Sequence, residues 1–76
     1  MEEVGEVFTY FSRVDVAGIN VTGNFKTGDK IKIGDLEFVI ESMEIDRKKV
    51  EEAKPGDSIG IKTPEKVKKG EKVYKL

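Results

Sequence analysis

Short stretches in which apolar and polar residues alternate, separated by turn residues, run through almost the whole chain of 76 residues. Alternation places every second side chain on the same face, which is the period of a β-strand and not of a helix. The stretches 14–21, 29–34 and 36–40 show it clearly, and residues 4–11 are mostly β-branched and aromatic. Turn signals recur every 8–12 residues, so the pattern predicts six or seven short strands in a small antiparallel barrel or sandwich.

The first predicted strand, residues 4–11, assigns its side chains to two faces by strict alternation. Phe8 and Tyr10 are expected on one face. The opposite face is expected to carry Val7, Thr9 and Phe11.

In residues 36–45 the apolar side chains switch half way along from one face of the predicted strand to the other. Leu36, Phe38 and Ile40 share one face, whereas Met43 and Ile45 belong to the other. A β-bulge near Glu41–Ser42 would turn both sets toward the core.

A helix is hard to place in this sequence. The best candidate, Arg47–Ala53, has only seven residues and is followed by Lys54-Pro55. Isolated helices of that length are marginal, so an all-β class is predicted. No internal repeat or linker stands out, and residues 1–76 are expected to form one domain, because separate cores need roughly 50–100 residues each.

Composition excludes several kinds of active site. The chain has neither cysteine nor histidine, which removes zinc–thiolate sites, disulfides, the usual general base and the commonest metal ligand. The serines have no histidine partner, and Glu2/Glu3 and Glu51/Glu52 are adjacent pairs that point to opposite faces of an extended chain. We therefore expect no catalytic residue, no bound metal, no cofactor and no enzymatic activity.

Location and environment are also constrained by composition. The acidic stretch MEEVGEVF has no apolar segment typical of a signal peptide, and no run approaches the roughly 20 apolar residues of a membrane span. We expect a cytoplasmic protein without membrane contact. Lys and Glu dominate a charged fraction of 38%, a bias that resembles heat-adapted (thermophile) proteins. Residues 62–76 carry six Lys and two Glu, a net charge of +4, which is read as ordinary surface.

The segment from Gly23 to Lys30 comes close to a phosphate-binding loop, with two glycines separated by four residues. The loop would need Lys and then Ser or Thr after the second glycine, followed by a helix. This chain has Asp29 and Lys30 there, followed by a predicted strand. Nucleotide binding is therefore not expected, and the glycines are interpreted as turn residues.

Residues 42–61, SMEIDRKKVEEAKPGDSIGI, carry a resemblance to a known family. They resemble the second, β-barrel domain of translational GTPases of the elongation factor Tu and elongation factor 1-alpha group, in which a V-E-M-x-R-K segment precedes a Pro-Gly-Asp turn. The Gly28-Asp29 turn and the preceding hairpin resemble the same domain. The resemblance covers about residues 4–76 and implies a six-stranded, closed antiparallel barrel in a stand-alone translation elongation factor-like protein.

In that family the barrel helps to hold the aminoacylated 3′ end of transfer RNA. Carried over to this chain, the resemblance implies a non-catalytic RNA-binding module with Glu44 near the terminal adenosine and Arg47 near the ester. The departures are Ser58 in place of the family's asparagine and the lack of room for the GTPase domain that completes the pocket. The candidate RNA-contacting residues are Phe11, Glu44, Arg47, Lys48 and Lys49.

Two other functions remain open at this point. The chain could be a protein-interaction module that docks on a separate GTPase or RNA-modification enzyme, with Phe8, Tyr10 and Tyr74 as candidate contacts. It could also be an accessory domain with a separate catalytic chain, because the same barrel accompanies some collagenase-like peptidases that act in RNA modification. The partners expected from these hypotheses are transfer RNA, the ribosome, or a protein of translation or RNA modification.

Overall fold

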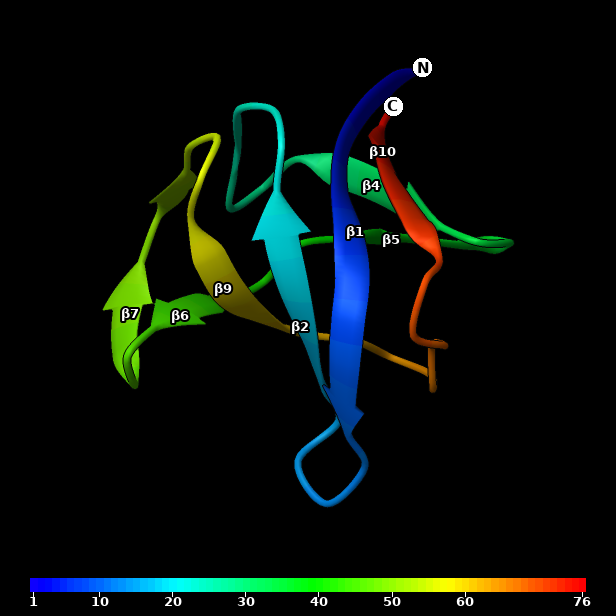
Figure 1. Ribbon diagram of the computed structural model, residues 1–76, viewed down its shortest axis with the longest axis vertical. Coiled ribbons are helices and arrows are strands. Elements are labelled where there is room, and N and C mark those ends of the chain that lie inside the picture. Colours follow the sequence, from blue (N-terminus) through cyan, green and yellow to red (C-terminus); the bar gives the residue numbers. More distant parts are fainter.

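The computed structural model describes residues 1–76 and contains strands only, so the all-β class is confirmed. Eight strands form one antiparallel sheet in the order β5-β4-β10-β1-β2-β9-β6-β7, and β3 pairs with β8 in a separate ribbon (Figure 1). The bounds are β1 Glu2–Phe11, β2 Val16–Val21, β3 Phe25–Lys26, β4 Lys30–Ile33, β5 Leu36–Val39, β6 Met43–Ile45, β7 Lys48–Val50, β8 Glu52–Ala53, β9 Ser58–Lys62 and β10 Lys72–Lys75.

The sheet is a curled half-barrel, and the expectation of a closed six-stranded barrel is wrong. The outermost strands β5 and β7 do not pair with each other. Instead, the turn after β3 lies between the two ends of the sheet. Thr27 N–H donates to Glu51 O at 2.9 Å, Gly28 N–H donates to Ile40 O at 2.9 Å, and Ile40 N–H donates to Asp29 O at 3.0 Å. A turn therefore fills the place where strand pairing would close a barrel.

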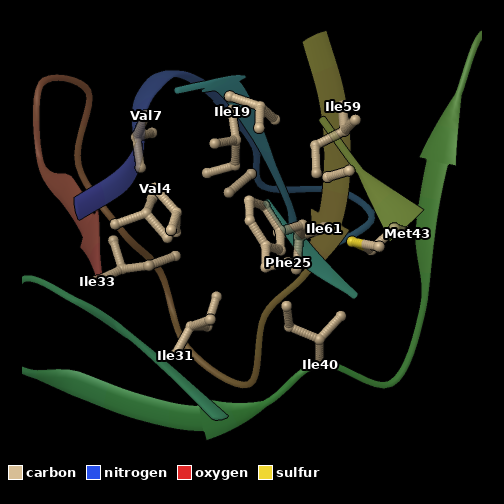
Figure 2. Packing of buried hydrophobic residues seen from close by; sticks show 14 of the residues in the cluster. Val4, Val7, Ile19, Phe25, Ile31, Ile33, Ile40, Met43, Ile59 and Ile61 are labelled. Carbon is tan, nitrogen blue, oxygen red and sulfur yellow. The ribbon is translucent and has the colours of Figure 1, made fainter. Parts of the chain in front are cut away.

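The core lies on the concave face of the sheet. Fifteen apolar side chains are buried there, and Figure 2 shows the ring of Phe25, on the small ribbon, among aliphatic side chains of the large sheet. Ile40 and Met43 are both buried, as the parity change in residues 36–45 requires. The strand is interrupted over residues 40–42 and no bulge occurs, because the chain crosses there from one end of the sheet to the other.

The predicted faces of β1 are corrected by a bulge. The register against β2 shifts between Val7 and Thr9, so one extra residue, Phe8, is inserted. Val7 is buried and Tyr10 packs against the core, whereas Phe11 is exposed. Strict alternation failed here because a bulge changes parity without any change in composition.

The marginal helix candidate at Arg47–Ala53 does not form, in agreement with the all-β prediction. Asp46 and Arg47 have positive φ values of 51° and 66° and connect β6 to β7, with Ile45 opposite Lys48. Two consecutive residues with positive φ are typical of a type I′ turn, whose twist matches that of a two-residue hairpin. In the hairpin, strand pairing provides hydrogen-bond partners for backbone N–H and C=O groups. A helix this short would have left many of these groups unpaired at its ends.

Three turns of the sequence Lys-x-Gly-Asp/Glu repeat one hydrogen-bonding device, although no repeat is apparent in the sequence as a whole. The turns are 26–29, 54–57 and 68–71, and their glycines have φ values of 91°, 96° and 94°. In each turn the N–H of the acidic residue donates to the lysine carbonyl at 3.0–3.2 Å, and the lysine N–H donates back to the carboxylate at 2.6–3.0 Å. Positive φ at the third position is the requirement of a type II turn.

Each of these turns also holds one buried residue of a neighbouring segment by two backbone bonds. The glycine N–H donates to the carbonyl of that residue, and the carbonyl of the acidic residue accepts from its N–H, at 2.8–3.0 Å. The residues held in this way are Ile40, Val21 and Val7. Gly28 and Asp29 therefore serve as turn residues, as predicted, and the Asp29 carboxylate accepts from Lys26 N–H.

Candidate docking surface on the outer face of the sheet

Two glycines face each other on the convex face of the sheet, where Gly18 of β2 pairs with Gly60 of β9. Their neighbours in sequence, Ala17 and Ile19, point into the core, so both glycines face outward. A Cβ built on Gly18 would lie 2.6 Å from Thr9 Cγ2 and 2.9 Å from Phe8 Cζ, and both side chains therefore lie on this outer face. Glycine within a strand commonly marks such a close approach.

Exposed apolar side chains surround this glycine pair. Phe8 is 38% exposed, Phe11 55% and Val14 56%, and the half-buried Val16 lies opposite Phe11 in the β1–β2 ladder. Single exposed apolar side chains are normal, but contiguous ones mark interaction sites. We call this group the outer-face patch, and its members are Phe8, Phe11, Val14, Val16, Gly18 and Gly60.

A hollow of about 360 Å³ lies at one side of the patch, between the β1–β2 turn and β6. Glu44 and Lys62 contribute opposite charges to its lining, and neither forms an ion pair within the chain. The remaining lining residues are Val14, Val16, Ser42 and Gly60. An apolar surface with two free charges of opposite sign at its side is suited to bind a partner in one orientation.

The five residues predicted to contact RNA do not converge on one site. Phe11 and Glu44 both belong to the outer face, but β2 and β9 separate their strands, which corresponds to roughly 14 Å at about 4.8 Å per strand. Arg47 lies in the β6–β7 turn, and Lys48 and Lys49 lie on the edge strand β7. Contact of these side chains with RNA stays a prediction.

Lys48 and Lys49 also have a structural explanation. The strand β7 is the last of the sheet, and lysines on an edge strand hinder pairing with another chain. Glu44 lies directly opposite Lys49 in the β6–β7 ladder. The basic segment DRKK therefore combines a type I′ turn with a protected edge.

The structure offers no metal centre and no membrane-spanning helix. No three side chains among Asp, Glu, His and Cys lie close enough together to hold an ion. None of the elements is a helix of the length and apolar character that a bilayer crossing requires.

Sequence reasoning missed the patch as a unit, although it named Phe8 and Phe11 individually. One available signal was the isolated glycine in each of the strand patterns VAGINV and SIGIK, because glycine inside a strand indicates close packing or a close partner. That Gly18 and Gly60 are neighbours could not be read from the sequence. They are 42 residues apart, and only the β2–β9 pairing brings them together.

Comparisons with known proteins show which proteins this chain is similar to. No family model matches the chain. The uncharacterized protease MJ0090 of Methanocaldococcus jannaschii is 39% identical over 79 residues, which covers 97% of this chain and 19% of that protein. The chain therefore spans about a fifth of the length of the curated relative it matches.

Two crystal structures share the architecture. The C-terminal domain of a Geobacillus thermoleovorans putative U32 peptidase superposes with a TM-score of 0.89 at 18% identity, covering 99% of this chain and 92% of that one. Its selenomethionine variant gives a TM-score of 0.91 at 17% identity, covering 97% and 99%.

These relatives overturn the resemblance to translational GTPases and, with it, the interpretation as a translation-factor-like module. Part of the motif that suggested it is the turn Lys54–Asp57, and that device occurs three times in this chain. The Gly28-Asp29 pair belongs to a second copy. The Lys-x-Gly-Asp turn occurs wherever the chain needs this turn geometry between strands. Its presence therefore indicates a type of β-structure and does not identify a family. This chain shares its fold with the C-terminal domain of a U32 peptidase.

Proposed function

We propose that the chain is a non-catalytic docking domain of a U32-type peptidase, and that the outer-face patch packs against the catalytic part of that enzyme. The observation that carries the proposal is the group of exposed apolar side chains around Gly18 and Gly60, on the face that folding leaves uncovered. The match to a fifth of a much longer protease supports a partner of this kind. Of the functions considered from the sequence, a protein-interaction module fits these observations better than an RNA-binding module.

The chemistry of the chain supports a binding role. It has no cysteine or histidine. The lining of the hollow beside Glu44 is mostly polar, with only two hydrophobic residues among six, unlike the mainly apolar pockets that hold small substrates.

The composition of the patch agrees with an interface between domains. Such interfaces bury about 600–1,500 Å² and are more polar than permanent subunit contacts. Phe8 and Phe11 would provide the apolar contact area, because aromatic side chains are enriched where binding energy is concentrated. Glu44 and Lys62 would each meet an opposite charge and so determine the orientation of the partner.

The test uses the absence of cysteine from the chain. The matching segment of the Methanocaldococcus jannaschii protein is replaced by this chain carrying Val14→Cys or Val39→Cys. The two valines are 56% and 51% exposed, and only Val14 belongs to the patch. The rate of thiol labelling at each position, read by peptide mass spectrometry, is compared with the rate in the isolated 76-residue chain.

We expect the thiol at position 14 to be labelled at least tenfold more slowly in the chimera, because the partner covers it, whereas labelling at position 39 changes little. Equal labelling rates at position 14 in the two settings would contradict the proposal. Slower labelling at position 39 alone would assign the interface to another surface.

A further inference from the structure

Cations outnumber anions around the outer-face patch. Arg13 lies in the β1–β2 turn, Lys62 on β9 and Lys49 on β7, and all three are exposed. The acidic residue that lies among them is Glu44 on β6. These four residues carry a net charge of +2, whereas the rest of the chain has 11 basic and 14 acidic side chains, a net charge of −3. The patch is therefore bordered by positive charge on a chain that is otherwise acidic.

The order of residues along the strands directs both lysines to the outer face. Lys62 follows Ile61 on β9, and Ile61 is fully buried. Lys49 precedes Val50 on β7, and Val50 packs against the core. Because successive side chains of a strand point to opposite faces, Lys62 and Lys49 project from the outer face.

The three cations have no ionic partner within the chain. All four ion pairs of the chain are formed by other lysines. The acidic residue closest in sequence to Arg13 on its turn is Asp15, and its Oδ1 accepts a hydrogen bond from Tyr10 OH at 3.2 Å. The Tyr10 ring packs against the core, so this bond engages the Asp15 carboxylate on the core side of the turn.

Glu44 does not neutralise the positive charge of this region. It lies opposite Lys49 in the β6–β7 ladder and opposite Gly60, two residues before Lys62, in the β6–β9 ladder, but it forms an ion pair with neither lysine. One carboxylate can offset only one of three cations. Exposed cations are hydrated, but a partner that covers them removes this water, and a buried charge without a counter-charge is costly. The partner must therefore supply carboxylates.

We propose that the surface of the catalytic part that covers the outer-face patch is apolar at its centre and acidic at its margin, with Asp or Glu side chains that meet Arg13, Lys49 and Lys62. The inference rests on the proposed docking function and specifies the chemistry of the partner surface. Complementary charges around an apolar contact fix its orientation and disfavour other partners.

A polyanion such as RNA would also meet these cations, but the apolar side chains favour a protein surface. Val14 and Val16 are aliphatic, whereas single-stranded nucleic acids are bound by aromatic side chains on which bases stack. Glu44 lies among the cations, where it would repel a phosphate backbone. A protein can instead place a cation opposite Glu44 and carboxylates opposite the lysines.

Zero-length cross-linking tests the charge of the partner surface. The chimera with the Methanocaldococcus jannaschii protein is treated with ribonuclease and then with a carbodiimide, which joins a lysine amine to a carboxylate in contact with it. Peptide mass spectrometry identifies the joined residues. We expect Lys49 or Lys62 to be joined to Asp or Glu of the catalytic part, whereas Lys66, which is exposed and lies outside the patch, is not. The absence of such links from both Lys49 and Lys62 would overturn the proposal.

Charge reversal separates this proposal from the docking function. Lys62→Glu and Lys62→Met are each combined with Val14→Cys, and the thiol labelling rate in the chimera is divided by the rate in the isolated chain with the same substitutions. This ratio cancels the direct effect of residue 62 on the thiol. Lys62→Glu should raise the ratio at least about fivefold, because it sets like charges against each other, and Lys62→Met should raise it less. Both isolated variants should keep the circular dichroism spectrum of the parent, since Lys62 is exposed and unpaired.

The outcomes distinguish the two claims. A low ratio in the chimera with the parent lysine that Lys62→Glu leaves unchanged would overturn the acidic partner surface and retain the docking function. A ratio near one with the parent lysine would overturn both. Protection of position 14 that is lost on ribonuclease treatment would assign the patch to RNA and would also overturn the proposal.

Discussion

The inner and outer faces of β1, β2 and β9 belong to the same strands but are built differently. On the inner face, Val7, Ile19 and Ile61 are fully buried, and the side chains interdigitate with those of the rest of the core (Figure 2). On the outer face, Phe8 and Phe11 remain partly or largely exposed beside two glycines. Burial of the inner face stabilises the fold, whereas the surface of Phe8 and Phe11 that remains exposed contributes little to it. Apolar residues that folding does not use are available for binding.

The largest effect on stability is expected from truncating a side chain on the inner face. Ile19→Ala should lower the free energy of unfolding by about 3 kcal/mol, because it removes a fully buried side chain and leaves a cavity. Denaturant unfolding measures the change. Val14→Ala on the outer face is the matched control and should change stability by less than about 0.5 kcal/mol. A loss below about 1 kcal/mol for Ile19→Ala would contradict the assignment of this residue to the core.

A smaller effect is expected from filling the glycine pair of the outer face. Gly18→Ala should destabilise the fold by about 1–2 kcal/mol, because the new methyl group would lie 2.6 Å from Thr9 Cγ2. Gly60→Ala is the control, since its new methyl group would meet only Val16 Cγ1, at 3.0 Å. Thermal melting of both variants, and of Gly18→Ala combined with Thr9→Ala, measures the contact. Equal losses for the two glycines, or no recovery in the double variant, would show that steric contact is not the cause.

Polar substitutions in the outer-face patch should weaken binding of the partner and leave the stability of the chain unchanged. Phe11→Ser with Val14→Ser should change the free energy of unfolding by less than about 0.5 kcal/mol per site, because both side chains are more than half exposed. In the chimera with the Methanocaldococcus jannaschii protein, the same pair should expose the patch to proteolysis and hydrogen exchange. A large loss of stability in the isolated chain would instead make these residues part of the fold.

The smallest effect is expected at the charged end of the outer face. Lys72 Nζ lies 2.6 Å from Glu6 Oε1 and 3.9 Å from Glu3 Oε2, and the hydrogen bond and charge of Glu6 raise the pKa of Lys72, with Glu3 adding to the effect. Because the folded-state pKa is raised, the stabilisation is complete below the ordinary lysine pKa of about 10.4 and is lost as pH rises through the folded-state value.

Lys72→Met should therefore remove a small stabilisation that is present at neutral pH, and the variant should differ least from the parent chain at the most alkaline pH. Unfolding followed from pH 7 to about 11.5 checks the direction, spanning the lysine titration range. Lys66→Met is a suitable control, because Lys66 is exposed and has no ion pair. A difference between parent and Lys72→Met that grows with pH would contradict the ion pair as the source.

The local sequence predicted the strands well where the alternation of apolar and polar side chains was sufficient to define them. Residues 30–33 alternate as expected, and the turns at Gly28 and Gly56 occur where turn chemistry indicated. The interpretation failed at Phe8, where a bulge shifts parity. The bulge depends on pairing with another strand, which a local pattern does not contain.

The candidate surface was less predictable than the fold. Phe8 and Phe11 were visible as aromatic residues, but their strict alternation placed them on opposite faces, whereas the bulge brings both outward. The family resemblance failed for a related reason. A Lys-x-Gly-Asp turn is selected by backbone geometry, so its presence indicates a kind of turn in any protein that needs one.

The sequence by itself determined which segments are extended, where they turn and which side chains are apolar enough to form a core, because these properties depend on neighbours along the chain. Tertiary structure alone decided the strand order, the open curl of the sheet and the meeting of Gly18 with Gly60. It also decided that β7 and β5 became the edges. Alternation specifies the face on which a side chain lies, but the strand that lies beside it is chosen by the packing of the whole core.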